Sequence, residues 1–282
     1  MALKLMYITN RVEVAEIALS AGVERVFIDL EIIGKADRQG GMDTVQSKHT
    51  VADVAAMRKA LPSAELLVRC NPIHDAVGQY GTTEQEIDDI VAAGADVIML
   101  PFFKTVPEVE RFLKAVNGRA RTMLLFETPE SAALAEAIVS LPGIDEVFIG
   151  LNDMSLGFGM KFMFQLVADG TVERLCRIFS NAKLPYGFGG IAALGKGMLP
   201  AERVIAEHYR LGSTCAILSR SFCNTDIITD LQQVRDIFKS GLADIRAFEA
   251  QCAAKQISFE ENYHALVSAV ADICKCIEEK AK

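Results

Sequence analysis

The sequence predicts an α/β protein of the (β/α)₈ barrel class, with extra helices at its C-terminal end. Eight short apolar runs recur along the 282 residues, and each is followed by a stretch with helical periodicity. Most runs are continuously apolar instead of alternating, as in parallel strands that are covered on both faces. No GxGxxG motif follows the first run, which weakens the alternative of an open dinucleotide-binding sheet. Eight strand–helix repeats in a chain of this length therefore favour a closed barrel.

The segments between the apolar runs have the signals of helix starts and stops. Gly22 is placed to end a helix in a left-handed conformation, and Thr82 can open one with a capping box. Pro129 suits the first turn of another helix. The predicted strands cover residues 3–9, 25–31, 65–70, 95–102, 121–127, 146–151, 185–190 and 214–220. The clearest predicted helices cover residues 12–22, 82–94, 128–143 and 200–212.

Two domains are expected. Residues 1–223 form the barrel and carry the active site, and residues 224–282 form a C-terminal helical extension. Within the extension, residues 226–241 and 261–280 both have apolar stripes. A barrel does not need these helices to close. We therefore expect them to pack on the barrel or to be exchanged with a neighbouring subunit of a homo-oligomer.

Composition excludes several classes of partner. The net charge of −8 disfavours nucleic acid, because phosphate binding needs a basic surface. No apolar run approaches the roughly 20 residues that a membrane helix needs. The N-terminus lacks the features of a secretory signal, and the seven cysteines include no CxxC pair. These features predict a cytoplasmic protein with reduced thiols.

Two carboxylates stand at the ends of consecutive predicted strands. Glu127 ends TMLLFE and Asp153 follows EVFIGL, 26 positions later, which is one strand–helix–strand repeat. On parallel neighbouring strands both would reach the same rim of the sheet. Oxygen ligands of this kind suit a hard divalent cation such as Mg²⁺. The alternative is a pair of helix-entry residues, since Asp153 and Thr128 are good caps.

Arg69 and His49 are the other candidates for chemistry. Arg69 ends the otherwise apolar strand ELLVR, and its guanidinium can fork onto a carboxylate or an enolate. The alternative is a structural ion pair with Asp29 or Glu31. His49 lies in the long loop after the second strand and could act as a general base. Equally, it could be a polar residue at the start of the next helix.

Two loops carry groups that could contact an anion. The loop after the second strand contains Lys35, Arg38 and Lys48, which could face either an anionic substrate or solvent. The glycine-rich segment 187–197 could present backbone N–H groups to a carboxylate or phosphate, or could simply pack closely at the barrel rim. Neither pattern decides between its alternatives.

Three stretches of the chain are similar to a known family. They are GADVIMLPFFKTVPEVERF, the Glu-Thr pair that ends the fifth strand, and LPGIDEVFIGLNDMSLGFGM. Over roughly residues 24–222 the chain resembles the HpcH/HpaI aldolase and citrate lyase beta-subunit family. The resemblance implies a (β/α)₈ barrel with a divalent metal, Mg²⁺ or Mn²⁺. It also implies a trimer or hexamer that exchanges a C-terminal helix.

The resemblance assigns roles to particular residues. The two metal carboxylates of the family look like Glu127 and Asp153, and the arginine that binds the substrate carboxylate looks like Arg69. Gly150 and Asn152, in the matching PGIDEVFIGLND segment, are expected to contact the substrate together with Arg69 and Asp153. Two positions depart from the family pattern. Ile32 stands where aldolases of the family have histidine and citrate-lyase relatives have aspartate, and Leu125 stands where aldolases have glutamine.

The expected activity is that of a metal-dependent carbon–carbon lyase of the class II aldolase type. Its substrate would be a 2-oxo acid or a 3-hydroxy carboxylate, cleaved or formed through a pyruvate-like enolate. One alternative is an acyl-CoA lyase of the malyl- or citramalyl-CoA type, which would use a CoA thioester. Another is a non-catalytic barrel that binds a small acid. The sequence leaves the acceptor aldehyde open.

Overall fold

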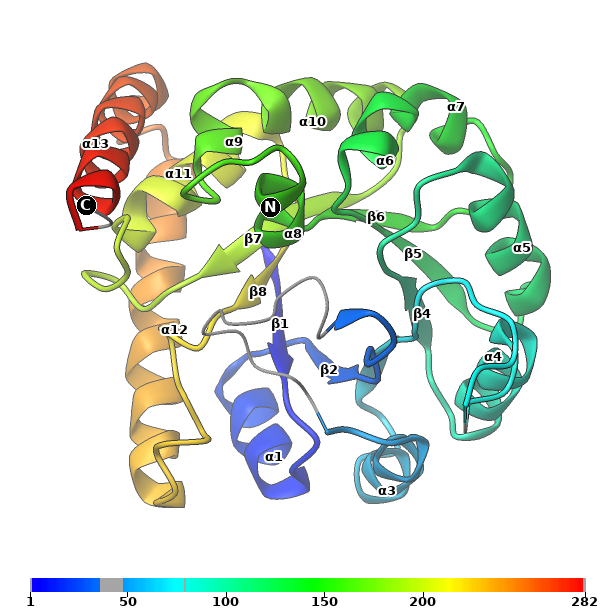
Figure 1. Ribbon diagram of the computed structural model, residues 1–282. Helices are drawn as coiled ribbons and strands as arrows, with labels where there is room; N and C mark the ends of the chain where they lie inside the picture. The colour runs from blue at the N-terminus through cyan, green and yellow to red at the C-terminus, as the bar shows by residue number, and fades with distance from the viewer. Residues whose placement is uncertain (1, 36–47, 79, 281–282) are drawn as a thin grey trace.

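The barrel predicted from the repeats is present. The computed structural model describes residues 2–35, 48–78 and 80–280. Eight parallel strands pair in chain order, and the last pairs with the first, so the sheet closes on itself (Figure 1). The strands are β1 (Lys4–Ile8), β2 (Arg25–Asp29), β3 (Glu65–Arg69), β4 (Val97–Leu100), β5 (Arg121–Phe126), β6 (Glu146–Ile149), β7 (Tyr186–Ile191) and β8 (Cys215–Leu218).

Helices surround the barrel on its outer side (Figure 1). The capping signals act as expected: Gly22 ends a helix with φ 111°, and the Thr82 side chain accepts the N–H of Gln85 in a capping box. The helices are α1 (Val12–Ala21), α3 (Val51–Ala60), α4 (Thr83–Ala92), α5 (Val106–Val116), α6 (Pro129–Ala133), α7 (Ala135–Val139), α8 (Leu151–Gly157), α9 (Gln165–Ala168), α10 (Thr171–Asn181), α11 (Ala201–Leu211), α12 (Leu231–Ala253) and α13 (Phe259–Lys280).

The prediction of one helix over residues 128–143 was wrong. The segment contains two short helices, α6 and α7, which meet at Leu134. Leu134 has φ −96° and ψ 9°, outside the helical range, which separates the two helices there. The apolar periodicity of the segment does not reveal this break, because Leu134 and its neighbours all favour helix.

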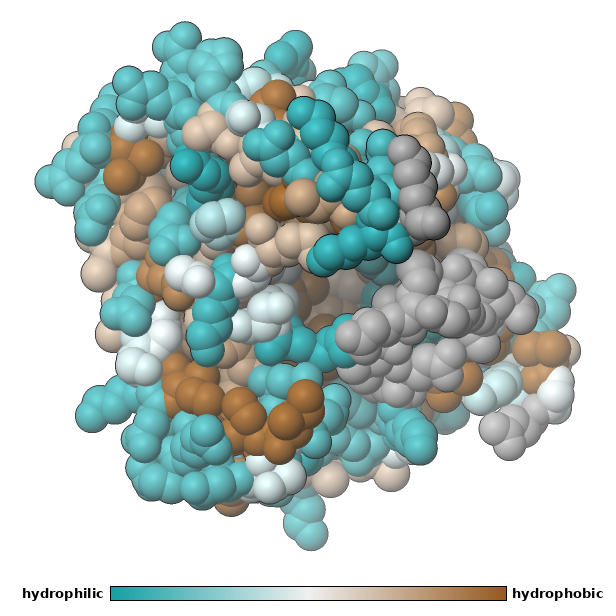
Figure 2. Space-filling model, turned by 60° about the vertical axis from the view of Figure 1, so that its left-hand side comes forward, coloured by the Kyte–Doolittle hydropathy of each residue, from teal (hydrophilic) through white to brown (hydrophobic). Residues whose placement is uncertain are grey.

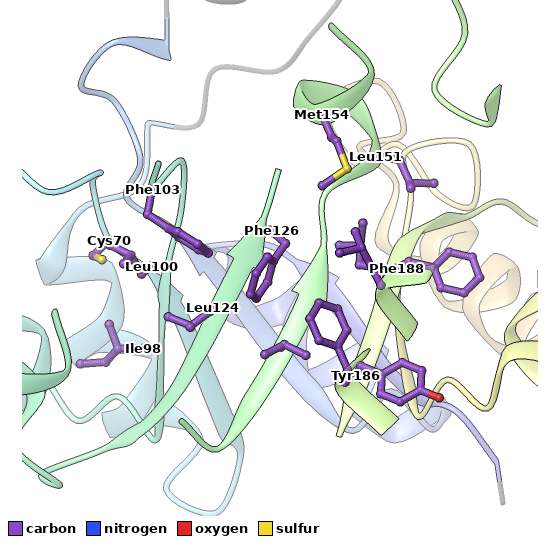
Figure 3. Close-up of a cluster of buried hydrophobic side chains, with 14 of the residues drawn as sticks. Cys70, Ile98, Leu100, Phe103, Leu124, Phe126, Leu151, Met154, Tyr186 and Phe188 are labelled. Atoms are coloured by element: carbon purple, nitrogen blue, oxygen red, sulfur yellow. The ribbon is translucent and has the colours of Figure 1, made fainter. Parts of the chain in front are cut away.

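Buried apolar side chains form one layer inside the barrel and others outside it. Met6, Phe27, Leu67, Met123 and Phe148 are among those that fill the interior. The larger cluster lies between the strands and the surrounding helices, and Figure 3 shows part of it. Inside the barrel, apolar residues therefore occupy the middle level. Polar residues are left for its two ends.

The C-terminal helices pack on the barrel that precedes them. Helix α12 runs beside α1 (Figure 1), where Phe238 meets the ring of Tyr7 edge-on at 4.9 Å. Helix α13 lies against α11 and α9. The expected helix over 226–241 is displaced: α12 begins after its cap Asp230 and continues past Gly241. Gly241 does not end the helix but lets the Phe222 ring approach, since a Cβ there would lie 2.8 Å from it. Exchange of these helices between subunits stays a prediction.

Candidate active site

A cavity of about 660 Å³ opens at the C-terminal ends of the strands, where barrel enzymes place their active sites. Figure 2 shows the molecule hollowed on one face. All six residues that the sequence singled out line this cavity. They are His49, Arg69, Glu127, Gly150, Asn152 and Asp153. They come from four different strand ends, so closure of the barrel is what brings them together.

Glu127 and Asp153 lie one strand apart, as their spacing predicted. Glu127 directly follows β5, is 4% exposed, and accepts the backbone N–H of Phe102 at 2.9 Å. Asp153 lies in the first turn of α8, just after β6, and is 7% exposed. The Asn152 amide donates to Asp153 Oδ1 at 3.3 Å. Both carboxylates are therefore held on the same side of one cavity.

Gly150 makes room for the Glu127 carboxylate. A Cβ at position 150 would lie 2.8 Å from Glu127 Cβ and 2.9 Å from its Oε2. The backbone N–H of Gly150 donates to the Phe126 carbonyl at 2.9 Å, which fixes the two strand ends side by side. Any larger residue at position 150 would clash with Glu127. The absence of a side chain there therefore allows the Glu127 carboxylate to occupy its place.

Arg69 is held by two carboxylates. Its Nε and Nη2 each donate to one oxygen of Asp29, both at 2.8 Å, and its Nη1 lies 3.3 Å from Glu31 Oε2. Lys35 joins the same group, with Nζ 3.0 Å from Asp29 Oδ2 and 3.5 Å from Glu31 Oε2. We call Asp29, Glu31, Lys35 and Arg69 the rim cluster. Arg69 thus makes the structural ion pairs and lines the cavity as well.

Within the rim cluster, Asp29 and Arg69 shift each other's pKa toward the charged form. Burial would raise the pKa of Asp29, but the charges of Arg69 and Lys35 hold it well below its usual value. Burial likewise opposes a raised pKa for Arg69, yet Asp29 and Glu31 move it upward. A guanidinium carries five N–H bonds, and three of them face these two carboxylates, so two are left for a ligand.

His49 packs against the end of β2. Its Nδ1 accepts the backbone N–H of Asp29 at 3.0 Å, which leaves the proton of the neutral ring on Nε2. Burial lowers the pKa of His49, so the neutral form prevails at pH 7. The general-base role stays a prediction. Since Nδ1 is engaged by the backbone, any proton transfer by this ring would pass through Nε2.

Of the glycines in the segment that the sequence singled out at β7 and after it, some line the cavity and another is needed for close packing. Gly189 and Gly190 line the cavity, as do Ser219 and Arg220 after β8. Gly187 serves packing instead, because a Cβ there would lie 2.2 Å from the Cys215 carbonyl oxygen. Arg38 falls among residues 36–47, outside the described part of the chain.

Lys35 is the cavity residue whose position the sequence did not decide. Its sequence context fits either contact with an anionic substrate or a solvated basic face; in the structure it is only 4% exposed and lines the cavity. Loop residues have no periodicity that reveals burial. The one available signal was the proximity of Lys35 to two strand-end acids, Asp29 and Glu31, whose charges it can balance.

The donor set fits a hard divalent cation. Within residues 2–35, 48–78 and 80–280, no three metal-ligating side chains of histidine, cysteine, aspartate or glutamate gather into one group. Mg²⁺ needs no such group, since one or two carboxylates with water and substrate oxygens complete its shell. Glu127 and Asp153 supply two carboxylates, and Gly150 leaves space beside one of them.

The fold and the strand-end site define a (β/α)₈ barrel with its polar residues at the C-terminal rim. A sequence profile of the HpcH/HpaI aldolase/citrate lyase family matches residues 5–165, more than half of the chain. The protein belongs to this family of lyases and aldolases, as the resemblance implied. A search of curated proteins finds no match.

Solved structures of the same family have the same fold. The HpcH/HpaI aldolase from Desulfitobacterium hafniense DCB-2 gives a TM-score of 0.59 at 13% identity, over 77% of this chain and 86% of that one. A HpcH/HpaI aldolase/citrate lyase family protein from Burkholderia cenocepacia J2315 gives 0.59 at 15%, over 83% and 95%. The citrate synthase SbnG gives 0.57 at 14%, over 83% and 94%. Identities this low support the fold alone.

None of the described helices is long and apolar enough to cross a membrane.

Proposed function

We propose that the protein is a divalent-metal-dependent carbon–carbon lyase that cleaves or forms a 2-oxo acid or a 3-hydroxy carboxylate through a pyruvate-like enolate. The observation that carries this proposal is the shared cavity of Glu127, Asp153 and Arg69. Two carboxylates suit the cation and an arginine suits the substrate carboxylate. Membership of the HpcH/HpaI family supports the reaction class.

Some side chains of the cavity would hold the cation, and another would orient the substrate. Glu127 and Asp153 would hold Mg²⁺ or Mn²⁺, which when bound supplies Lewis-acid stabilisation of an enolate. Arg69 directs its remaining N–H bonds at the substrate carboxylate and fixes its orientation. Asp29 and Glu31 fix the guanidinium in turn, so it does not have to be ordered when substrate binds.

The cavity walls favour charge stabilisation. Met99, Leu125 and Phe148 form an apolar floor beneath the charged residues. An apolar floor excludes water and strengthens the attraction between the cations and a developing enolate. Leu125, which replaces the glutamine of related aldolases, belongs to this floor and brings no proton-transfer group.

Metal dependence is the first test. Protein treated with EDTA should lose 2-oxo acid aldolase activity and the exchange of pyruvate methyl protons in deuterated water. Mg²⁺ or Mn²⁺ should restore both. Glu127→Ala and Asp153→Ala should each lower the exchange rate by about 100-fold or more, as expected when charge stabilisation is removed. Full activity in either variant would end the proposal.

A second candidate function is that of an acyl-CoA lyase. The size of the cavity is compatible with this function. A volume of about 660 Å³ lies within the range that holds drug-sized ligands and exceeds what pyruvate needs. The surplus space would take either an acceptor aldehyde or the arm of a CoA thioester. Turnover of 2-oxo acids without any CoA compound would exclude the thioester reaction as the main function. Metal binding without any proton exchange would favour a non-catalytic barrel.

A further inference from the structure

We propose that Lys35 is the proton donor of this reaction, delivering a proton to the carbon of the enolate. The inference rests on the proposed function and names the acid that the function still lacks. The position directly after Glu31 does not supply one. Ile32 stands there, its side chain is apolar and 43% exposed, and it does not line the cavity.

Lys35 is placed as a buried acid should be. It is 4% exposed, yet it lines the cavity. Its Nζ donates to Asp29 Oδ2 at 3.0 Å and lies 3.5 Å from Glu31 Oε2. An ammonium carries three N–H bonds: one donates to Asp29, and a second can face the Glu31 carboxylate. The third can serve a ligand in the cavity.

The turn that carries Lys35 is built by residues outside the rim cluster. The Asn71 side-chain oxygen accepts the backbone N–H groups of Ile32 and Ile33, both at 2.8 Å. The Asn71 amide donates to Glu86 Oε1 at 2.8 Å, which fixes the orientation of the side chain. Gly34 adopts φ 72°, and the Lys35 N–H closes the turn on the Ile32 carbonyl at 3.2 Å. Lys35 is therefore directed back over the barrel mouth and away from solvent.

The topology puts Lys35 and the metal carboxylates on different sides of the substrate. In the closed barrel β2 and β6 are four strands apart in either direction, so they face each other across the axis. Lys35 follows β2, whereas Asp153 follows β6 and Glu127 follows the adjacent β5. A 2-oxo acid held on the β5–β6 side would present the remote face of its enolate to Lys35.

The rim cluster is balanced in charge, with two carboxylates and two cations. A buried group of this kind is weak evidence for stability, since desolvation offsets much of the attraction. Its value here is that two carboxylates fix Lys35 Nζ beside the cavity. Arg69 cannot replace it as an acid, because a guanidinium does not give up its proton in proteins.

The proposed step balances in atoms and charge. In cleavage the substrate hydroxyl loses its proton to water, and the electrons of the broken carbon–carbon bond pass into the 2-oxo fragment as an enolate. The enolate carbon then forms a C–H bond with a proton from Lys35 Nζ, whose N–H electrons remain as a lone pair. The neutral amine regains a proton from water. One proton is released and one is taken up, so the turnover has no net change.

Two reactions separate enolate formation from protonation. Loss of CO₂ from oxaloacetate yields the pyruvate enolate without an acid, whereas exchange of pyruvate methyl protons in deuterated water needs proton transfer at carbon. The variants are Lys35→Arg, which keeps the charge, and Lys35→Met, which removes it. The control is Lys114→Arg, at an exposed lysine on α5 that does not line the cavity.

In Lys35→Arg we expect exchange to fall by about 100-fold or more, the usual contribution of a positioned acid. Decarboxylation should stay within about threefold, and so should the affinity for oxalate by calorimetry, because the ion pairs are kept. Lys35→Met should lose exchange as well. Lys114→Arg should match the wild type in both reactions, with circular dichroism showing that all variants are folded.

Three outcomes would overturn the inference alone. Wild-type exchange in Lys35→Arg would remove the need for this acid. A parallel fall in exchange and decarboxylation would mark Lys35 as a support for Asp29 and Arg69. A pyruvate adduct on Lys35 after borohydride treatment would mean an imine mechanism instead. A wild-type protein that performs neither reaction with Mg²⁺ would overturn the proposed function itself, and this inference with it.

Discussion

The two ends of the barrel both carry buried charges but use them differently. At the N-terminal end, Lys4, Arg25, Glu65, Arg121 and Glu146 form a group that we call the base cluster. Arg25 is fully buried; two of its nitrogens bind Glu146 at 2.9 and 2.7 Å, and its Nε binds Glu65 at 2.7 Å. Arg121 pairs with both glutamates too. None of these residues lines the cavity at the other end.

The rim cluster has similar ion pairs beside an open space. Asp29 and Arg69 are register partners on β2 and β3, as Arg25 and Glu65 are at the other end. The inward positions of β2 run from Arg25 through Phe27 to Asp29, two residues apart each time. The same ladder thus provides an ion pair at each end. Only the rim pair faces the cavity, so we assign chemistry to the rim cluster, whereas the base cluster keeps the buried Arg25 and Glu146 paired.

Breaking the base cluster should have the largest effect. Arg25→Met leaves Glu146 buried without its main partner, so the free energy of unfolding should fall by about 3–5 kcal/mol. Urea denaturation measures it. Adding Glu146→Leu to Arg25→Met should recover part of the loss, because the buried carboxylate that lost its main partner is then absent. A loss below about 1 kcal/mol would contradict the stabilising role of the base cluster.

Crowding the rim should weaken metal binding while the fold persists. In Gly150→Ala the new Cβ would lie 2.8 Å from Glu127 Cβ and force the carboxylate to move. We expect Mg²⁺ affinity to fall by about tenfold, or about 1.4 kcal/mol, measured by calorimetry. Gly81→Ala is the matched control, since its Cβ would crowd only the Gln85 side chain. Equal Mg²⁺ affinity in Gly150→Ala and wild type would show that the absence of a side chain at position 150 is not needed for metal binding.

Lowering the pH should weaken the base cluster gradually. We expect this loss of stability to be the smallest of the three effects. Burial would raise the pKa of Glu65, but hydrogen bonds from Arg25 and Arg121 lower it from 4.5 to about 2. A lowered pKa contributes stability that is complete above pH 4.5 and is lost as the pH falls toward 2. Glu65→Gln should therefore show a flatter dependence of melting temperature on pH in this window. An unchanged slope would mean that Glu65 is not the group responsible.

Much of the fold followed from local patterns. Continuous apolar runs and helix caps such as Thr82 depend on residues close in sequence, and the barrel followed by counting them. Glu127, Asp153 and Arg69 could be placed at the rim because a strand end is a sequence-local property. The break at Leu134 could not be placed this way, since Leu134 and its neighbours favour helix and no capping or breaking residue marks the position.

The hydrogen-bond and ion-pair partners of the site residues could not be predicted from local sequence patterns. Whether Arg69 pairs with Asp29, or Lys35 returns to the same carboxylates, depends on the loop after β2 and on Asn71, which comes from the next strand. The engagement of His49 Nδ1 by the Asp29 N–H is likewise a contact between segments 20 residues apart. Such contacts fix tautomer and charge, and only the folded arrangement shows them.

A crystal structure with Mg²⁺ and oxalate, a mimic of the pyruvate enolate, tests the central claim most directly. The account predicts Mg²⁺ between Glu127 and Asp153, with oxalate bound to the metal and an Arg69 N–H on an oxalate oxygen. Lys35 should lie on the opposite side of the oxalate. Mg²⁺ bound elsewhere, or oxalate held without contact to Arg69, would contradict the assignment of this rim as the reaction site.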